Sequence, residues 1–544
     1  MNTAVETKRA LLSPKADVAI VLAVCALAGA AVALIQHVHF LLAPLALALL
    51  AGAIVALAVF GFSGLLALIP LMLAFSLLQR FDETFAIPLE HHVALKPTFY
   101  LTFLCVALLG ARVLLNPTSG ALGKPELQRF LRRFFWTLAG FIVAGLITIG
   151  INCFFDDYLI DRDLTAELLA LTVVVLPVFF VLLLPRCGLS RARTLWAIRF
   201  MIGLGGLAGF ILAAFGILPG RVLDLIGWTQ AIGGTLDLVR GRLPLGHPNS
   251  VAAVILLLMP PAVVFGLGCD KGVWRLFHLA CAALMFLGVL FALSRSAMLC
   301  LVLILAPTML YLIWRARGWR RVVLSGLSFV FCAALVAIAL YLFSQYDFSR
   351  FWSRGYHEDA SVARRTDSLY TALAVWRDYP LFGISPDAFY MRFDIRKDWD
   401  MPGRDEISGL LFYKDRISAE TPHNVFLMAL SEFGLPGGSL FLLLLFYPLQ
   451  MLWRARKQPL ISDYDRLALS GLVFGFCGFL LMQFFGAELL AALRASIVFW
   501  VAAAFAANYA GLVENDAKRF AENTMISHAN PSGQCNATEP MGTP

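Results

Sequence analysis

The sequence predicts an all-α, polytopic membrane protein with about 14 transmembrane helices, within a range of 12–14. Three observations predict this class. Of the 544 residues, 60% are hydrophobic and 14% are charged, and the mean hydropathy is +0.79. The apolar residues form runs of roughly the 20 residues that a helix needs to cross a bilayer. Basic residues gather in alternate loops between these runs.

The apolar runs fall into two series that divide the chain. The first series comprises residues 18–36, 41–61, 62–78, 95–115, 134–153, 164–185 and 195–217. The second series comprises residues 248–268, 276–293, 296–314, 322–343, 424–453, 467–486 and 489–512. We therefore expect an N-terminal transmembrane region over 1–217 and a second transmembrane core over 218–512. The polar residues 513–544 are expected to form a disordered cytoplasmic tail.

The distribution of Lys and Arg predicts the orientation, because short loops rich in these residues stay in the cytoplasm. With Lys8 and Arg9 inside, the basic clusters at 315–321 and 454–466 fall on the same side, and both termini are cytoplasmic. The net charge of +8 then reflects topology, and no nucleic-acid partner is expected. The first apolar run exceeds a signal-peptide core and has no clear cleavage site, so we expect a retained span.

The longest predicted outer loop, residues 344–421, contains an amphipathic helix over about 361–379. Ser361 can cap its start, and Pro380 and Gly383 end it. One apolar face at helical spacing is formed by Val362, Leu369, Leu373 and Trp376. The basic pair Arg364 and Arg365 stands in its first turns. Spacing alone favours a helix that only touches solvent or lipid head groups.

Two further arginines stand at the outer mouths of predicted spans. Arg242 precedes the HPNS segment of residues 247–250, and Arg295 lies in the LSRSAM segment of residues 293–298. A guanidinium there can bind a lipid phosphate and anchor the span, or bind a substrate phosphate bidentately. Convergence of Arg242, Arg295 and Arg365 beside one histidine would favour the substrate interpretation, and separate faces would favour anchoring.

That histidine is His423, in the segment ETPHNVFLMALSEFGLPGG. Thr421 and Pro422 fit the N-cap and first position of a helix, which places the ring in the first turn. The positive end of the helix dipole favours a neutral ring, which can accept a proton as a general base. A polar cap whose ring bonds the neighbouring backbone is the alternative, and Asn424 can orient either version. Glycine and proline at the end of the segment are expected to break the helix.

Four segments, in this order and spacing, resemble the O-antigen ligase and polymerase superfamily. They are HPNSVAAVILLLMPP (247–261), SRSAMLCLVLILAP (294–307), ARRTDSLYTALAVWRDYPLFGISPDAF (363–389) and TPHNVFLMALSEFGLPGG (421–438). The resemblance covers roughly residues 220–512. Each segment alone is degenerate, whereas the ordered set, with a long loop just before the His-Asn pair, is more specific.

This resemblance implies an integral-membrane glycosyltransferase with a helical, GT-C-type fold in the bacterial inner membrane. Members take a glycan from an undecaprenyl diphosphate carrier on the periplasmic face and pass it to an acceptor hydroxyl, with inversion and without a metal. The acceptor is a lipid A-core sugar for a ligase and a second lipid-linked glycan for a polymerase. The resemblance therefore implies lipopolysaccharide or exopolysaccharide biosynthesis, and it leaves ligase and polymerase open.

The resemblance also implies roles for residues that match the family's motifs. His423 matches the candidate base, and Arg365 and Arg295 match basic residues proposed to hold diphosphate. The match of Arg242 is less secure because the spacing varies there. The predicted site comprises a base, four diphosphate-binding arginines and a supporting amide, namely His423; Arg365, Arg364, Arg295 and Arg242; and Asn424.

Neither a metal nor another cofactor is expected at this site. Preplaced guanidinium groups can stabilise the negative charge that develops on a leaving diphosphate, as a divalent ion does elsewhere. Among the acidic pairs, Asp398 with Asp400 lies in the outer loop and offers a competing metal site, whereas Asp463 with Asp465 is cytoplasmic. The ten cysteines lack CxxC spacing and are expected to be packing residues without disulfides.

A transporter or flippase of lipid-linked glycans is the alternative class. Such a protein would carry polar or charged residues near mid-span and discontinuous helices at matching places in two halves. The predicted spans are mostly free of charge, and the polar groups gather at one outer face. This distribution favours a surface catalytic site.

Overall fold

The computed structural model describes most of the chain. The described residues are 69, 87–88, 94–95, 97–115, 125–155, 164–217, 229–231, 239–241, 248–292, 294–319, 321–326, 360–386, 422–491 and 493–529. Within them, nine helices are long and apolar enough to span a membrane, and Thr98–Leu114 is a shorter apolar helix. The prediction of a helical membrane protein is confirmed. The predicted spans 18–36 and 41–61 lie outside the described residues, as do 62–78 except residue 69 and 322–343 beyond residue 326, so the total of fourteen stays a prediction.

The described elements follow one another as short strand pairs and long helices. In the first half of the chain they are β1 (Ile87–Pro88), β2 (Ala94–Leu95), α6 (Pro97–Leu115), α7 (Pro125–Phe155), α8 (Leu164–Val175), η3 (Leu176–Val178), α9 (Phe179–Leu183), η4 (Leu184–Cys187), α10 (Arg191–Ile217), β3 (Thr229–Ala231), β4 (Val239–Gly241), α12 (Pro248–Val264) and the π-helical turn η5 (Phe265–Cys269). The second half comprises α13 (Gly272–Phe291), α14 (Arg295–Arg315), α17 (Ala360–Asp378), α19 (Val425–Arg456), α20 (Asp463–Met482), α21 (Glu488–Ala491) and α22 (Leu493–Ala529). Both strand pairs are antiparallel, with Ile87 opposite Leu95 and Gln230 opposite Arg240.

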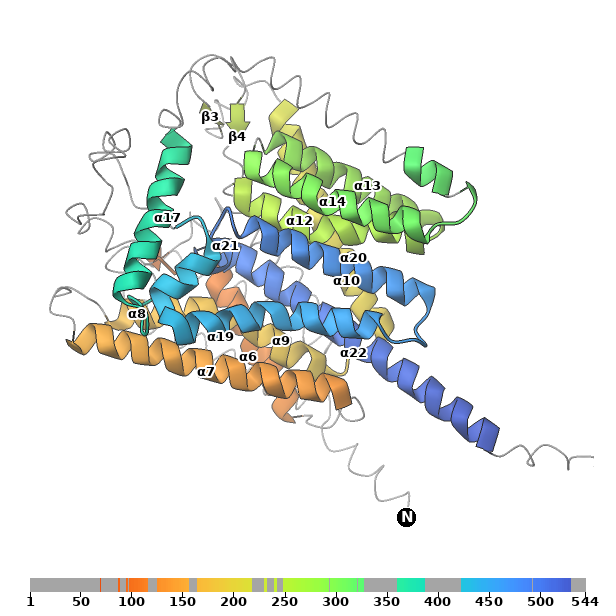
Figure 1. The fold of residues 1–544 in the computed structure, drawn as a ribbon, viewed down its shortest axis with the longest axis horizontal. Coiled ribbons are helices and arrows are strands. Elements are labelled where there is room, and N and C mark those ends of the chain that lie inside the picture. Colours follow the sequence, from red (N-terminus) through yellow and green to blue (C-terminus); the bar gives the residue numbers. More distant parts are fainter. Residues whose placement is uncertain are drawn as a thin grey trace, which may run out of the picture.

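The long helices pack side by side as a bundle around α22 and α12 (Figure 1). In the apolar window of α22, 94% of the residues are buried, and in that of α12 89% are, against 28% for α13 at the periphery. The alanine-rich stretch of α22, AAAFAANYAG, explains its place. Small side chains let α10, α12, α19 and α7 approach its backbone closely, which is how helices gain contact inside a membrane.

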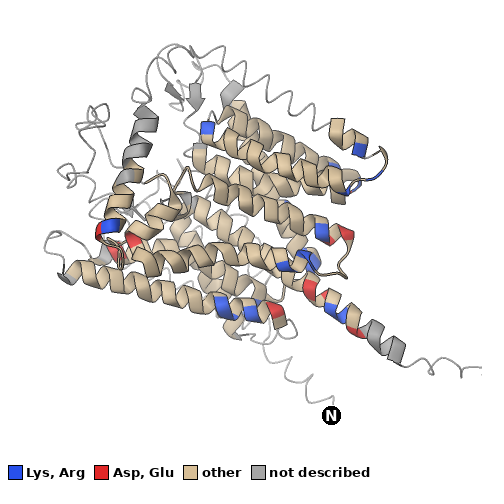
Figure 2. Cartoon of the chain, in the orientation of Figure 1, with Lys and Arg blue, Asp and Glu red and all other residues tan. Residues whose placement is uncertain are grey.

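Charged residues gather at the ends of the helices, and most of their length is uncharged (Figure 2). The C-terminal turns of α14 and α19 carry Arg315, Arg454 and Arg456, and α10 begins at Arg191. We call this the basic end of the bundle, and the opposite end, where α19 begins, the His423 end. The separation agrees with the loop pattern from which the orientation was predicted.

The prediction of a disordered tail over 513–544 is wrong for residues 513–529, because α22 continues to Ala529. Its polar end is held by neighbours at the basic end. Lys518 Nζ lies 3.0 Å from Glu126 Oε1 on α7, and Gln458 donates a hydrogen bond of 3.1 Å to Glu514. The polar residues up to Ala529 therefore belong to a helix whose side chains pair with neighbouring helices. Residues 530–544 lie outside the described residues.

The helix predicted within the long loop is confirmed as α17, which stands at a steep angle to the long helices near the start of α19 (Figure 1). The apolar face named from the sequence is not the most deeply buried one: Leu369 and Trp376 are partly buried. Leu373 is 42% exposed, whereas the buried positions are the smaller side chains of Ser368, Thr371, Ala372 and Val375. These follow helical spacing, and α17 packs against α19. Close approach of two backbones favours small residues, so the large apolar side chain of Leu373 faces away.

Candidate functional site at the start of helix α19

His423 lies immediately before α19, and the prediction that it occupies the first turn is wrong. Asn424 is the N-cap, and its Oδ1 accepts hydrogen bonds from the backbone N–H groups of Phe426 and Leu427, both at 3.0 Å. Its carboxamide oxygen therefore satisfies two of the N–H groups that every helix leaves open at its start. Asparagine caps better than threonine, which explains why the helix begins at Asn424 and not at Thr421.

The backbone of His423 adopts an uncommon conformation. Its φ angle is +50°, and among the described residues Ser385, at +89°, is the other non-glycine residue with positive φ. The ring is partly exposed. Histidine tolerates this region better than most residues, and such strain is held in place only by surrounding structure. His423 is therefore held in a defined position at the protein surface.

The turn between α20 and α21 provides that surrounding structure. Val425 N–H donates to the carbonyl oxygens of Gln483 and Gly486 at 3.0 and 3.1 Å, and Asn424 Nδ2 donates to the Phe484 carbonyl at 3.4 Å. The Phe426 and Phe484 rings lie 4.4 Å apart between centroids. The start of α19 is thus fixed to the turn by backbone bonds and by ring packing. Asn424 orients the helix start, since its two amide atoms bond the backbone.

The predicted arginines stand on different elements. Arg295 is the first residue of α14 and is exposed, and the Ser294 side chain before it caps the helix by accepting from Ala297 N–H. Arg364 and Arg365 lie in the first turns of α17, and their side chains are outside the described residues, as is the whole of Arg242. The convergence of these arginines beside His423 therefore stays a prediction.

Ten residues beyond the N-cap, α19 bends. Gly434 has φ +64° and ψ −174°, outside the helical region, and the helix then resumes and runs to Arg456. The predicted break is confirmed as a bend within one long element. The bend gives the first segment of α19, residues 425–433, its own direction.

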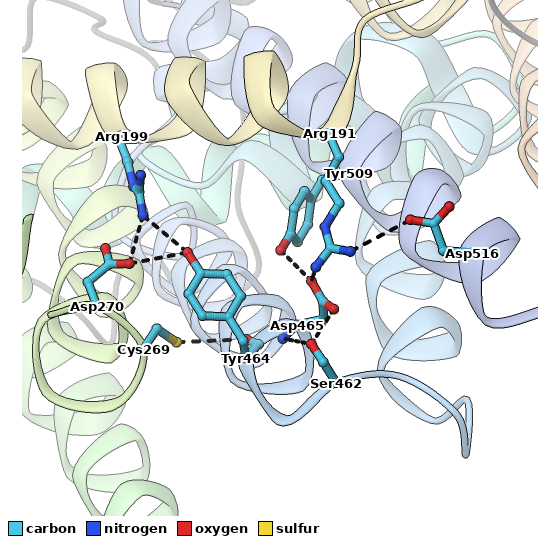
Figure 3. A network of polar contacts seen from close by, with 9 residues as sticks. All are labelled: Arg191, Arg199, Cys269, Asp270, Ser462, Tyr464, Asp465, Tyr509 and Asp516. Carbon is cyan, nitrogen blue, oxygen red and sulfur yellow. Dashed lines mark hydrogen bonds and ion pairs between the residues drawn. The ribbon is translucent and has the colours of Figure 1, made fainter. Parts of the chain in front are cut away.

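A second polar cluster lies at the basic end of the bundle, and Figure 3 shows its residues from close by. Asp465 accepts hydrogen bonds from Arg191, Ser462 and Tyr509, the last at 2.7 Å. Its side chain is 4% exposed, and α20, α10 and α22 each contribute a residue. The structure also pairs Asp463, the other acid of this predicted cytoplasmic pair, with Arg315.

The neighbouring part of this cluster is built around Asp270, which follows the π-helical turn η5. Its Oδ1 accepts from Arg199 at 2.7 Å and from the Tyr464 hydroxyl at 3.3 Å, and its Oδ2 lies 3.0 Å from His278 Nδ1. No pairing of Asp270 with Arg199 was predicted from the sequence. In the sequence, the only sign of such a pairing was that Asp270 directly follows a long apolar run, next to Lys271.

The two polar regions are separate. Asp465 lies in the first turn of α20, and Gln483, which holds the start of α19, follows the last residue of the same helix. At 1.5 Å per residue the two positions are about 27 Å apart. Arginines that pair with the buried carboxylates of Asp465 and Asp270, and so join α10 to α20 and to the turn after η5, are best understood as structural links. The His423 region is therefore the candidate functional site.

Comparison with known proteins supports the resemblance found in the sequence. A model of the O-antigen ligase family matches residues 280–442. This range includes α14 with Arg295, the whole of α17, His423 and the bend of α19. No curated protein matches the chain. Residues 280–442 are thus similar to the O-antigen ligase family, and they form the part of the bundle that holds the candidate site.

Proposed function

We propose that the protein is an integral-membrane glycosyltransferase of the O-antigen ligase or polymerase type. It transfers a glycan from an undecaprenyl diphosphate donor to a sugar hydroxyl, either of lipid A-core or of a second lipid-linked glycan. The His423 end faces the periplasm and the basic end faces the cytoplasm of a bacterial inner membrane. The observation that carries the proposal is that one family match, residues 280–442, contains all the motif residues except Arg242.

In this reaction the acceptor oxygen forms a bond to the anomeric carbon while the bond to the diphosphate oxygen breaks, with inversion. His423 takes the proton of the acceptor hydroxyl, and the bonding electron pair leaves with the lipid diphosphate. Arg295, Arg364, Arg365 and Arg242 bind that leaving group, and Asn424 supports His423 by fixing the helix start. A positioned base contributes about 10²–10⁴-fold, and preplaced cations stabilise developing charge without a metal.

The test is a product gel of purified protein with a lipid-linked glycan donor, run with and without lipid A-core. His423→Ala is expected to lower transfer by about 100-fold or more, since it removes the base. His528→Ala, near the end of α22, is the matched control and is expected to transfer normally. Transfer in excess EDTA is expected to continue, and its loss would contradict the metal-independent mechanism.

The products also separate the candidate activities. A shifted band that needs lipid A-core identifies a ligase, and a ladder of longer lipid-linked chains without it identifies a polymerase. Normal transfer by His423→Ala would overturn the assignment of the base. If a competent donor gives neither product, the transporter alternative is favoured, and carrier translocation in vesicles would then be measured.

A further inference from the structure

The bend of α19 leaves backbone groups that the helix cannot satisfy itself. A regular helix would pair the Glu432 carbonyl with the N–H of residue 436, but Pro436 has no N–H. Gly434 turns the chain out of the helical path just before it, so the Ser431 carbonyl and Leu435 N–H, which would pair in a regular helix, bond elsewhere. Unpaired backbone groups are costly in a membrane protein, so another segment must supply partners.

That segment is the turn that follows α17, residues 380–385. Three backbone hydrogen bonds join it to the bend: Leu435 N–H to the Pro380 carbonyl at 2.8 Å, Ile384 N–H to the Ser431 carbonyl at 2.9 Å, and Ser385 N–H to the Glu432 carbonyl at 3.0 Å. We call this contact between residues 380–385 and 431–435 the glycine crossing. It joins the end of α17 directly to the interior of α19.

Two glycines make so close an approach possible. A Cβ atom on Gly383 would lie 2.5 Å from the Glu432 carbonyl and from Gly434 N, and one on Gly434 would lie 2.2 Å from the Leu381 carbonyl oxygen. Both glycines have positive φ, at +67° and +64°. The obstructing atoms are backbone, so they cannot rotate away as a side chain would. Only glycine fits at either position.

Helices α7 and α8 hold the turn from the other side. Thr148 Oγ1 donates to the Phe382 carbonyl at 2.7 Å, Asn152 Nδ2 donates to the Gly383 carbonyl at 3.3 Å, and Ser385 Oγ donates to Glu167 Oε2. Asn152, Ser385 and Glu167 are buried. The glycine crossing is therefore fixed to three helices, and the turn cannot pivot without breaking these bonds.

Two helical arms leave this fixed point. One arm is α17, in which Arg365 lies about 20 Å along the helix axis from the last residue, Asp378. The other arm is the first segment of α19, and His423, just before it, lies about 16 Å from Gly434. The two arms diverge from the crossing (Figure 1). A rotation of 10° at the crossing would move Arg365 by about 3 Å, since displacement grows with the length of the arm. Misplacement of about 1 Å can cost 100-fold in rate.

We propose that the glycine crossing sets the position of the basic start of α17 relative to His423, and that Gly383, Gly434, Thr148 and Asn152 are positioning residues for glycan transfer. The inference rests on the proposed function. These residues are assigned no contact with the substrate. They act by fixing the angle between the two arms, so that the groups that bind diphosphate and the base meet the same donor.

The experiment measures transfer and helix docking in the same variants. Gly434→Ala is expected to lower kcat at least tenfold and to speed hydrogen exchange of the α17 amides by about tenfold, because α17 loses its anchor. Gly150→Ala is the matched control on α7, since a Cβ there meets nothing within 4 Å, and it is expected to change neither quantity.

A milder pair of variants covers the case in which Gly434→Ala fails to fold. Thr148→Val removes the hydroxyl that holds the Phe382 carbonyl, and it is expected to lower kcat severalfold with KM for the donor changed less. Thr148→Ser keeps the hydroxyl and is expected to restore both kcat and the slow exchange of α17. Restoration by serine distinguishes the hydrogen bond from general packing.

The outcomes separate this inference from the function on which it rests. Faster α17 exchange with unchanged kcat would overturn the positioning role, and so would lower kcat with unchanged α17 exchange. If the wild-type protein transfers no glycan from a competent donor, the proposed function fails and the inference falls with it.

Discussion

The two ends of the bundle are joined by different kinds of contact. At the basic end, charged side chains link the helices, with Asp465 between Arg191 and Tyr509 and with Asp270 beside Arg199. At the His423 end, backbone groups bond backbone groups, at the glycine crossing and at the start of α19. Long side chains can change rotamer and keep a contact while helices shift, whereas backbone contacts fix the direction of the chain. The more rigid kind of contact lies where we propose that chemistry occurs.

The largest expected effect is at the basic end, on stability. Asp465→Ala removes the acceptor for Arg191 and for the buried Tyr509 hydroxyl, and we expect a loss of about 3 kcal/mol in the free energy of unfolding. Arg191 is partly exposed and can rehydrate, which keeps the loss at the low end of the range for buried pairs. Thermal unfolding in detergent micelles measures the effect.

The neighbouring acid is the control for this prediction. The Asp463 side chain is 83% exposed although it pairs with Arg315. Asp463→Ala is expected to cost less than about 1 kcal/mol, as exposed pairs do. Equal losses for the two variants would contradict the view that burial makes the basic end a structural link.

The two ends of a single helix sharpen the comparison. Arg295 begins α14 at the His423 end, and Arg315 ends it at the basic end. Arg295→Ala is expected to lower kcat/KM for the lipid-linked donor by about 10–100-fold, because it removes one of the groups that stabilise the leaving diphosphate. Arg315→Ala is expected to stay within about twofold of wild type. Similar losses in both variants would argue for lipid anchoring or stability and against diphosphate binding.

The smallest expected effect concerns the helix start. Asn424→Ala removes the cap of α19, and we expect a loss of about 1 kcal/mol in stability. Transfer should fall as well, because the backbone of His423 is held next to this cap. Asn424→Asp keeps the capping oxygen and should retain stability and most of the transfer, as measured by unfolding and by the product gel. Full transfer by Asn424→Ala would show that the cap does not position His423.

Much of the fold could be predicted from the sequence, because spans are set by length and hydrophobicity. Each predicted run from 95–115 onward, apart from 322–343, corresponds to described helix. Boundaries were less predictable. α7 begins at Pro125, nine residues before the predicted span, and α22 runs on to Ala529, because charged helical turns extend beyond the apolar run and pair with one another.

The candidate site was predictable in its residues and less so in its geometry. The motifs and the resemblance pointed to His423, and the exposed Arg295 lies where a span was expected to begin. The capping role of Asn424 was missed because Thr421 and Pro422 offered a plausible helix start of their own. The glycine crossing was missed because it joins residues about fifty positions apart, and a bond between two backbones leaves no mark in side-chain periodicity.

The bend in α19 also divides the helix into a part long enough to cross a bilayer and a shorter part that the crossing does not need. Residues 435–456 extend about 33 Å, which by itself matches a hydrocarbon core of about 30 Å. The first segment, residues 425–433, adds about 13 Å that the span does not need. Because Gly434 turns this segment out of the helical path, the bend lets contacts with the turn between α20 and α21 place the start of α19 without lengthening the part that crosses the bilayer.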